Sequence, residues 1–146
     1  MLNIGTTREI IILGDFNGHT GTKVNNQVVG LYGETRINDN GERLIDLCES
    51  HNLRIMNGYF KHRMIHKYMS EQHTRKLKSI IDYIIVKQKS KFQIHDVRVQ
   101  RGINCGSDHY ELKCTYQYEE EQVIQISMMK TMKFHVSKIK LGHLSR

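Results

Sequence analysis

The 146-residue chain contains no proline and only three cysteines, and it has no long apolar run. No segment approaches the roughly 20 apolar residues that cross a membrane. The aliphatic run Ile10–Leu13 is too short for the core of a signal peptide. Cys48, Cys105 and Cys114 form no Cys-x-x-Cys pair, which predicts reduced thiols rather than a disulfide framework or a zinc site. We therefore expect an intracellular protein, neither secreted nor membrane-bound, with a nuclear location left open.

The basic charge is concentrated in the middle third of the chain. The whole chain is 38% hydrophobic and 25% charged, which suits one packed domain, and its net charge is +7. Residues 61–101 hold 11 Lys/Arg against 3 Asp/Glu, whereas residues 1–60 hold 5 against 7. A basic stretch of this kind favours polyanions such as nucleic acid. A solvated surface with no ligand is the alternative.

Two short apolar runs and one helical pattern define the expected elements of the first 86 residues. Residues 9–13 and 79–86 are β-branched and apolar without alternation, which predicts two strands buried on both faces. Residues 18–40, rich in Gly, Asn and Thr, predict a long loop. Residues 41–51 predict a helix with Leu44, Leu47 and Cys48 on its apolar side, and Asn38 or Asn40 is the candidate cap.

The later part of the chain predicts further strands. LRIMN after Asn52 and IHDVRV at residues 94–99 are typical of short strands. Residues 109–116 alternate, so that Tyr110, Leu112, Cys114 and Tyr116 share one face. From residue 118 the pattern breaks at an acidic run, and it assigns no element to the Met- and Lys-rich remainder.

Asp15 and Asn17 are the first candidate site residues. They lie two apart after the first apolar run, so their side chains project to the same face. The carboxyl ends of strands in open α/β sheets are where ligands bind, and a carboxylate beside an amide can orient water and hold a phosphate oxygen. Gly14 and Gly18 flank them, so a simple turn is the alternative interpretation.

Asp82 is the second candidate, because it interrupts an otherwise apolar strand. A carboxylate there is costly unless a cation or an imidazole pairs with it, although a structural Asp bonded to backbone or to Lys is the alternative. The turn before residue 109 carries Asp108 and His109, and His109 is a natural partner for Asp82. His62 and His66 lack the HExxH pattern, so we interpret them as surface or phosphate-contacting residues.

Three motifs in order carry a resemblance to a known family. They are Ile11-Ile12-Leu13-Gly14-Asp15-Phe16-Asn17, Ser79-Ile80-Ile81-Asp82-Tyr83-Ile84-Ile85-Val86 and Gly106-Ser107-Asp108-His109. The ordered set resembles the C-terminal part of the endonuclease/exonuclease/phosphatase superfamily, the deoxyribonuclease I-like fold. It is most similar to the endonucleases of non-LTR retrotransposons and to craniofacial development protein 2-like proteins.

The resemblance implies a fold and a domain division. The fold is of the α/β (α+β) class, a partial two-layer β-sandwich whose N-terminal half is missing. Residues 1–117 would form the partial domain and residues 118–146 a divergent tail. Because the two sheets of such a sandwich cover each other, a lone half would expose an apolar face through which it could self-associate.

The resemblance also implies site roles. Asp15 would orient the attacking water and, with Asp108, bind Mg²⁺ or Mn²⁺. Asn17 would hold the scissile phosphate, and Asp82 would orient His109, which stabilises the transition state. The metal site is expected to be incomplete, because the family's metal-binding Glu has no counterpart here. Contacts to the DNA backbone would come from basic residues of the middle third, namely Lys61, Arg63, Lys67, Arg75, Lys76 and Lys78.

Three functions remain open at this point. The first is metal-dependent phosphodiester hydrolysis of nucleic acid by a retrotransposon-derived endonuclease fragment, active or inactive. The second is a non-catalytic nucleic-acid-binding remnant. The third, which the basic segment disfavours, is a phosphatase of the same superfamily acting on a lipid or a small phosphate. A translated fragment without a selected role is the default against all three.

Overall fold

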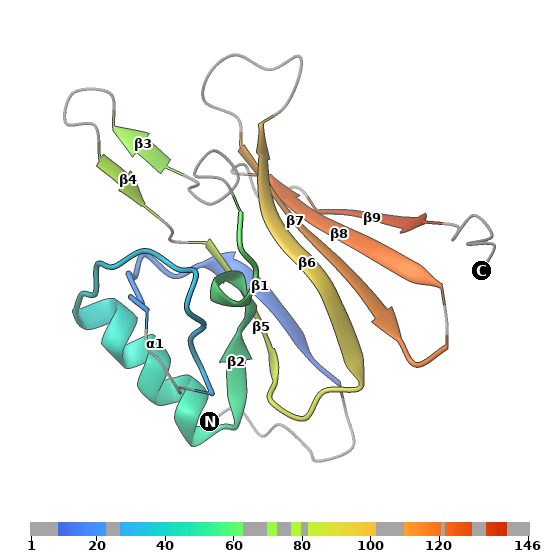
Figure 1. Ribbon diagram of the computed structural model, residues 1–146, viewed down its shortest axis with the longest axis horizontal. Coiled ribbons are helices and arrows are strands. Elements are labelled where there is room, and N and C mark those ends of the chain that lie inside the picture. Colours follow the sequence, from blue (N-terminus) through green and yellow to red (C-terminus); the bar gives the residue numbers. More distant parts are fainter. Residues whose placement is uncertain are drawn as a thin grey trace.

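The computed structural model describes residues 9–22, 27–62, 70–72, 77–79, 82–101, 110–120, 122–129 and 134–139. The strands and helices in these ranges are labelled in Figure 1. In chain order they are β1 (Ile11–Asp15), α1 (Asp39–Ser50), β2 (Leu53–Ile55), the 3₁₀-helix η1 (Met56–Tyr59), β3 (Ser70–Gln72), β4 (Leu77–Ser79), β5 (Asp82–Lys87), β6 (Phe92–Arg101), β7 (Tyr110–Tyr118), β8 (Val123–Met129) and β9 (Phe134–Ile139).

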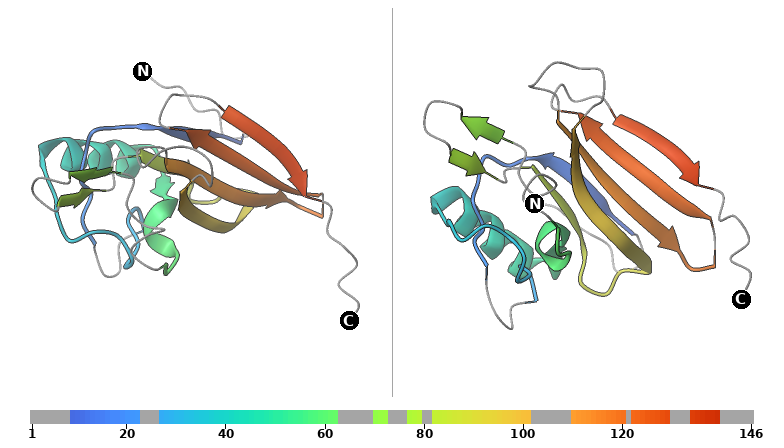
Figure 2. Two further views of the ribbon diagram at one scale, coloured as in Figure 1. Left: turned by 90° about the horizontal axis from the view of Figure 1, so that it is seen from above. Right: turned by 45° about the horizontal axis from the view of Figure 1, so that its top comes forward.

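The strands form two main antiparallel sheets. The first sheet has the order β1-β5-β2, and the second has the order β6-β7-β8-β9. A separate hairpin pairs β3 with β4. In Figure 1 the first sheet lies between α1 and the second sheet. Figure 2 shows the strands of the second sheet side by side, with β9 at the edge farthest from α1. The predicted α/β sandwich is therefore confirmed.

Strand β5 is the centre of the packing. Tyr83 and Ile85 project from one face into a cluster with α1, while Ile84 and Val86 project from the other face into a cluster with β6 and β7. All four side chains are at most 3% exposed. The expectation of a strand buried on both faces is confirmed for residues 82–86, but the predicted start at Ser79 is wrong, because Ser79 ends β4 and pairs with Ser70 of β3.

Strand β1 differs from its prediction as a central strand buried on both faces. It lies at the edge of the three-stranded sheet, and its aliphatic residues Ile11–Leu13 are only partly buried. Ile12 packs on the helix-side cluster, whereas Ile11 and Leu13 pack on the cluster between the sheets. Both faces therefore contact core, but among the described residues only β5 pairs with β1. An apolar run predicts two covered faces, but it carries no signal for the number of neighbouring strands.

Helix α1 begins where its cap was expected. The Asn38 side chain accepts a hydrogen bond from the Gly41 N–H, as in a typical N-cap. Leu44, Ile45 and Cys48 are buried, whereas Leu47 is 42% exposed. The expected apolar position of Leu47 is therefore wrong. Ile45 takes its place, because positions 44, 45 and 48 fall on one stripe of the helix and position 47 falls outside it.

The second sheet continues beyond the point where the sequence pattern broke. Leu112 and Cys114 are completely buried, which confirms the alternation expected for β7. After a turn at Glu119 and Glu120, β8 pairs along β7 and β9 pairs along β8. Glu119 and Glu120 therefore lie in a turn of a β-meander, and the described residues after them add two strands to the sheet. Ile124 and Ile126 of β8 are partly buried, and the exposed large hydrophobic residues of the described ranges, Leu31, Tyr32, Ile37 and Leu47, lie outside the two sheets.

The described cysteines are isolated thiols. Cys48 lies in the helix-side cluster and Cys114 in the cluster between the sheets, and both are free. Burial raises the pKa of each thiol to about 12, so both stay protonated at neutral pH. Cys105 lies outside the described residues.

No helix in the described ranges is long and apolar enough to cross a membrane.

We predict that Ile84→Ala lowers the free energy of unfolding by about 2–5 kcal/mol, because it removes a fully buried side chain between the two sheets. Urea unfolding followed by circular dichroism measures the loss. Leu47→Ala is the control, since Leu47 is exposed on α1, and we expect a change within about 0.5 kcal/mol. Equal losses in the two variants would contradict the central place of β5.

Candidate active site

The structure brings Asp15 and Asp82 together at one end of the first sheet. Asp15 is the last residue of β1 and pairs in register with Asp82, the first residue of β5. By strand alternation both side chains lie on the sheet face that carries Ile84. Asp82 is 6% exposed, whereas Asp15 is exposed to solvent. Two carboxylates that are 67 positions apart in the sequence thus occupy directly opposite positions.

This pairing is electrostatically unusual. Residues opposite each other on an antiparallel pair have Cβ atoms about 4.5–5.5 Å apart, and like charges there are destabilising. A hard divalent cation is one group that relieves such repulsion, because Mg²⁺ binds carboxylate oxygens. Asp15, the exposed member of the pair, has the donor chemistry for such an ion. Within the described part of the chain, no group of three or more His, Cys, Asp or Glu side chains could hold a metal ion.

The loop after β1 has a defined turn geometry. The Asp15 Oδ1 atom accepts a hydrogen bond from the Asn17 N–H at 2.8 Å. Asn17 has a φ of 47°, in the left-handed region that Asn tolerates better than most residues. The Asn17 carbonyl accepts a bond from Asn40 Nδ2 at 3.1 Å. The turn interpretation of these residues is therefore correct in its geometry, and the same turn leaves Asn17 exposed beside Asp15.

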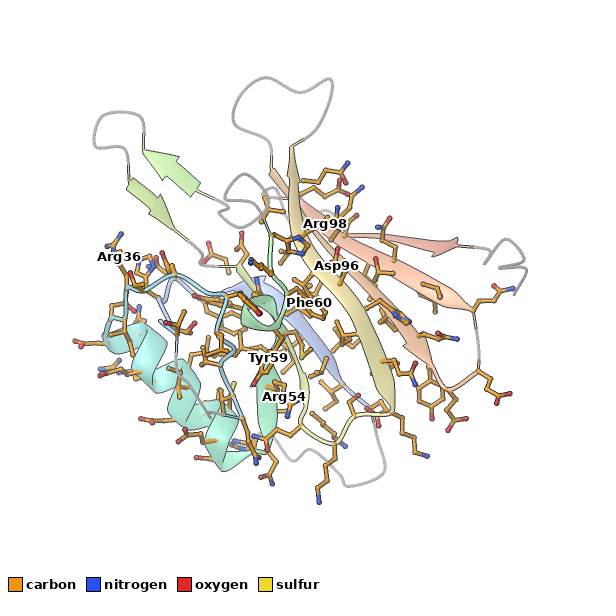
Figure 3. The ribbon with its side chains drawn as sticks, viewed as in Figure 1. Arg36, Arg54, Tyr59, Phe60, Asp96 and Arg98 are labelled. Carbon is orange, nitrogen blue, oxygen red and sulfur yellow. The ribbon has the colours of Figure 1, made fainter. Side chains whose placement is uncertain are left out.

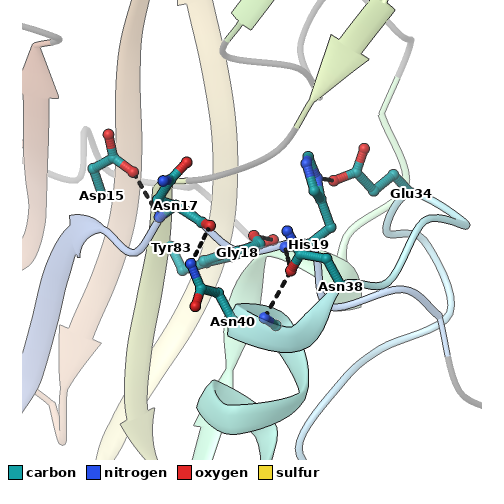
Figure 4. Close-up of polar contacts among 9 residues, drawn as sticks. Asp15, Asn17, Gly18, His19, Glu34, Asn38, Asn40 and Tyr83 are labelled. Carbon is teal, nitrogen blue, oxygen red and sulfur yellow. Dashed lines mark hydrogen bonds and ion pairs between the residues drawn. The ribbon is translucent and has the colours of Figure 1, made fainter.

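The N-terminus of α1 holds this loop in place. Figure 4 shows Asn38 Oδ1 between two backbone donors, the N–H of His19 at 2.9 Å and that of Gly41 at 2.8 Å. The backbones approach so closely that a Cβ on Gly41 would lie 1.7 Å from the His19 carbonyl oxygen. A Cβ on Gly18 would lie 2.9 Å from the Gly41 nitrogen. Glycine is therefore required at both positions.

Strand β5 holds the same loop from the other side. The Tyr83 hydroxyl donates a hydrogen bond to the Gly18 carbonyl at 2.7 Å (Figure 4). Burial raises the pKa of Tyr83, so the hydroxyl keeps the proton that this bond needs. The positions of Asp15 and Asn17 thus depend on α1 and on β5 together.

Three residues of this region were not predicted. His19 Nδ1 contacts Glu34 Oε1, and the Glu34 side chain is buried. Asn57 of η1 bonds to the backbone of β5 on both sides of Tyr83. His19 and Glu34 lie in a Gly- and Asn-rich loop that has no periodic pattern, so nothing in the sequence pairs them. Asn57 ends the LRIMN run that was predicted as a strand, but the strand stops at Ile55 and Asn57 lies in η1, so no sequence signal marked its role.

Most of the chain matches a known protein family. Residues 2–113 match the family model described as endonuclease–reverse transcriptase. The chain belongs to this family, within the endonuclease/exonuclease/phosphatase superfamily. Craniofacial development protein 2 of Tragulus javanicus is 31% identical over 100 residues, and that of Bos taurus is 30% identical over the same length. These residues make up 68% of this chain and 17% of each relative. No solved structure matches the chain significantly.

Several residues that the family resemblance singled out lie outside the described residues. These are Asp108, His109, Arg63, Lys67, Arg75 and Lys76. Arg101 at the end of β6 pairs with Tyr110 at the start of β7, so the segment with Asp108 and His109 is bounded by two adjacent strand ends. Lys78 lies in β4 opposite Glu71, and Lys61 is exposed just after η1.

The described surface of this endonuclease-family chain also carries cations that were not singled out. Figure 3 labels Arg54 in β2, Tyr59 in η1 and Arg98 in β6. The Arg54 guanidinium lies 5.1 Å from the centre of the Tyr59 ring. Arg98 Nε is 2.5 Å from Asp96 Oδ2, and His62 Nε2 is 2.6 Å from Asp96 Oδ1. His62 is therefore bonded to a carboxylate and mostly covered, rather than a free surface residue.

We predict that Asn38→Ala loosens the loop that carries Asn17. The variant removes the acceptor of two backbone bonds, so we expect a loss of about 1–2 kcal/mol in unfolding free energy. Hydrogen exchange of the His19 amide should accelerate by more than this global loss explains. Ser50→Ala removes a hydroxyl bond at the other end of α1 and should leave the His19 amide protected. Unchanged exchange of the His19 amide in Asn38→Ala would contradict the prediction that the Asn38 side chain holds this loop.

Proposed function

We propose that this chain is the catalytic part of a metal-dependent endonuclease that hydrolyses phosphodiester bonds in DNA, and that it derives from a retrotransposon. The observation that carries the proposal is the opposed pair Asp15 and Asp82 at the end of the first sheet, in a chain of the endonuclease–reverse transcriptase family. Carboxylates that converge at a sheet end are the side chains that metal-assisted hydrolysis requires. A location inside the cell, where thiols such as Cys48 and Cys114 stay reduced, agrees with this function.

The different exposure of the two carboxylates supports different roles. Asp15 is exposed, so it can orient the water that attacks phosphorus and accept its proton. Asp82 is buried, so it serves to orient His109 rather than to contact substrate. Asn17, exposed beside Asp15, would hold a phosphate oxygen through its amide.

The remaining roles belong to residues of the 102–109 segment. Imidazolium at His109 would stabilise the extra negative charge that develops on the phosphoryl oxygens as the bond to the leaving oxygen breaks. Asp108 would join Asp15 as a metal ligand. When bound, Mg²⁺ or Mn²⁺ would neutralise charge on the scissile phosphate.

A non-catalytic nucleic-acid-binding protein is the second candidate. The basic excess of residues 61–101 favours it, because such a surface binds phosphates whether or not the chain hydrolyses them. The surface of β2 and η1 combines Arg54, Tyr59 and the exposed Lys61 just after η1, a mixture of cations and an aromatic ring that suits phosphates and bases. Both candidate functions have DNA as the partner, and they differ in whether the chain hydrolyses it.

We predict that the purified chain nicks supercoiled plasmid in the presence of Mg²⁺ and that EDTA abolishes the activity. Asp15→Asn and His109→Ala should each lower the rate by about 100-fold or more, because each removes a group that acts on the reacting atoms. Agarose-gel quantification of nicked plasmid measures the rate. Asp46→Asn removes an equal charge from the exposed face of α1 and should nick at the wild-type rate.

The outcomes separate the candidates. Nicking that survives both EDTA and His109→Ala would reject the endonuclease proposal. DNA binding without any metal-dependent nicking would support the non-catalytic candidate. Release of phosphate from inositol phosphates, with intact plasmid, would point to a phosphatase of the superfamily.

We predict that DNA binding weakens steeply with salt, because each phosphate contact releases counterions. Lys61→Gln should lower affinity and reduce the slope of log K against log salt by about one. Fluorescence anisotropy with a labelled duplex at several salt concentrations measures both quantities. Lys89→Gln changes an exposed lysine in the hairpin between β5 and β6, at the far end of the sandwich, and should leave the slope unchanged. Salt-independent affinity of the wild-type chain would contradict a phosphate-binding surface.

A further inference from the structure

The side chain of Asn57 replaces a missing stretch of strand beside β5. Strand β2 pairs with β5 only as far as Ile55, which lies opposite Ile85. The chain then turns into η1 at Met56, so no β2 peptide reaches the part of β5 that begins with Asp82. The backbone groups of β5 on this side need other partners, because buried peptide groups are costly to leave without hydrogen bonds.

The Asn57 amide supplies both partners. Its Nδ2 atom donates to the Asp82 carbonyl oxygen at 2.9 Å, and its Oδ1 atom accepts from the Ile84 N–H at 2.9 Å. These two groups flank Tyr83 and point to the same side of β5. One donor and one acceptor on a planar amide match what a neighbouring strand would present there.

The position of this contact links it to the candidate site. Asp82 is the first residue of β5, where a strand end would otherwise fray. Its other strand neighbour is Asp15, whose like charge disfavours close pairing. The bond from Asn57 fixes the Asp82 peptide on the side away from β1, and a fixed backbone restricts the direction of the side chain.

The chemistry of the bridging residue also fits this place. An amide provides donor and acceptor without charge, whereas a carboxylate at position 57 would add a third negative group near Asp15 and Asp82 and would lose the donor. Met56 and Gly58, on either side of Asn57, are buried, so water is excluded from much of its surroundings. A short, neutral, two-sided hydrogen-bonding group is what this setting selects.

We propose that Asn57 is a positioning residue for Asp82 in phosphodiester hydrolysis, an inference that rests on the function proposed above. Asn57 touches neither substrate nor metal in this scheme. It acts through the backbone of β5, by holding the Asp82 carboxylate in one orientation at the end of the first sheet. Residues that orient an active-site group in this way change turnover far more than substrate binding.

The test compares three variants of the full chain. Asn57→Leu removes both bonds, Asn57→Asp keeps the acceptor for Ile84 and removes the donor to Asp82, and Gln88→Ala is the matched control. Gln88 Nε2 also donates to a backbone carbonyl of the same sheet, that of Leu53 at 3.1 Å, but at the far end of β5. The control therefore removes a similar bond without reaching Asp82.

We expect kcat for plasmid nicking to fall about 10- to 100-fold in both Asn57 variants, with KM for DNA within about twofold of wild type. Gln88→Ala should retain wild-type kcat even if its melting temperature falls as much. If Asn57→Leu does not fold, Asn57→Asp carries the comparison. Wild-type kcat in a folded Asn57 variant, or an equal loss in Gln88→Ala, would overturn the inference.

A second measurement does not depend on activity. NMR three-bond couplings report the χ1 rotamer of Asp82, and we expect one rotamer in the wild-type chain and in Gln88→Ala but averaging in the Asn57 variants. A single unchanged rotamer in all four proteins would overturn the inference by itself. If the wild-type chain does not nick DNA, the proposed function fails, and the couplings still decide whether Asn57 positions Asp82.

Discussion

Strand β5 is packed between α1 on one face and the second sheet on the other, and this double burial sets the geometry of the candidate site. Tyr83 and Ile85 fill one cluster, while Ile84 and Val86 fill the other. A shift of β5 by one residue relative to β1 would turn each pair of side chains toward the opposite cluster and disrupt the packing of both. The register between β5 and β1 is therefore strongly specified. Because the register is fixed, Asp82 stays opposite Asp15. The chemistry at the sheet end therefore depends on apolar packing several residues away.

Tyr83 connects the helix-side cluster to the loop that follows β1. Its ring packs 6.3 Å from that of Phe16 in the helix-side cluster, and its hydroxyl bonds to the Gly18 carbonyl. The same loop rests on the N-terminus of α1, where the close approach of His19 and Gly41 leaves no room for a side chain. A loop held at two points by rigid elements can keep Asn17 in a left-handed conformation, which an unsupported loop would sample among others.

Residue spacing along the chain predicted those elements whose structure depends on neighbouring residues. The buried strand that begins at Asp82 and the alternation of β7 follow from residue types and spacing alone, and the same reasoning narrowed the helix cap to Asn38 or Asn40, of which the structure uses Asn38. The edge position of β1 could not be predicted, because pairing partners are distant in sequence. The turn before β8 was hidden because Glu119 adopts a φ of 51° where Gly or Asn would have signalled a turn. Asp15 was predictable as a polar residue at a strand end, whereas Asp82 was predicted inside a strand and is in fact the first residue of β5. The backbone partner of Asn57 lies 25 positions away and follows no motif.

The distribution of charge constrains how such a site could act on a phosphodiester. The carboxylates of Asp15 and Asp82 lie at the end of the first sheet, and by themselves they repel a phosphate. Under the proposed function, attraction must come from elsewhere, and the basic excess of residues 61–101, with 11 Lys/Arg against 3 Asp/Glu, would supply it. Long-range attraction by that segment and local neutralisation by a divalent cation are therefore separate requirements. A chain that kept the first and lost the second would still bind DNA, so affinity alone says nothing about whether the carboxylate pair is in use.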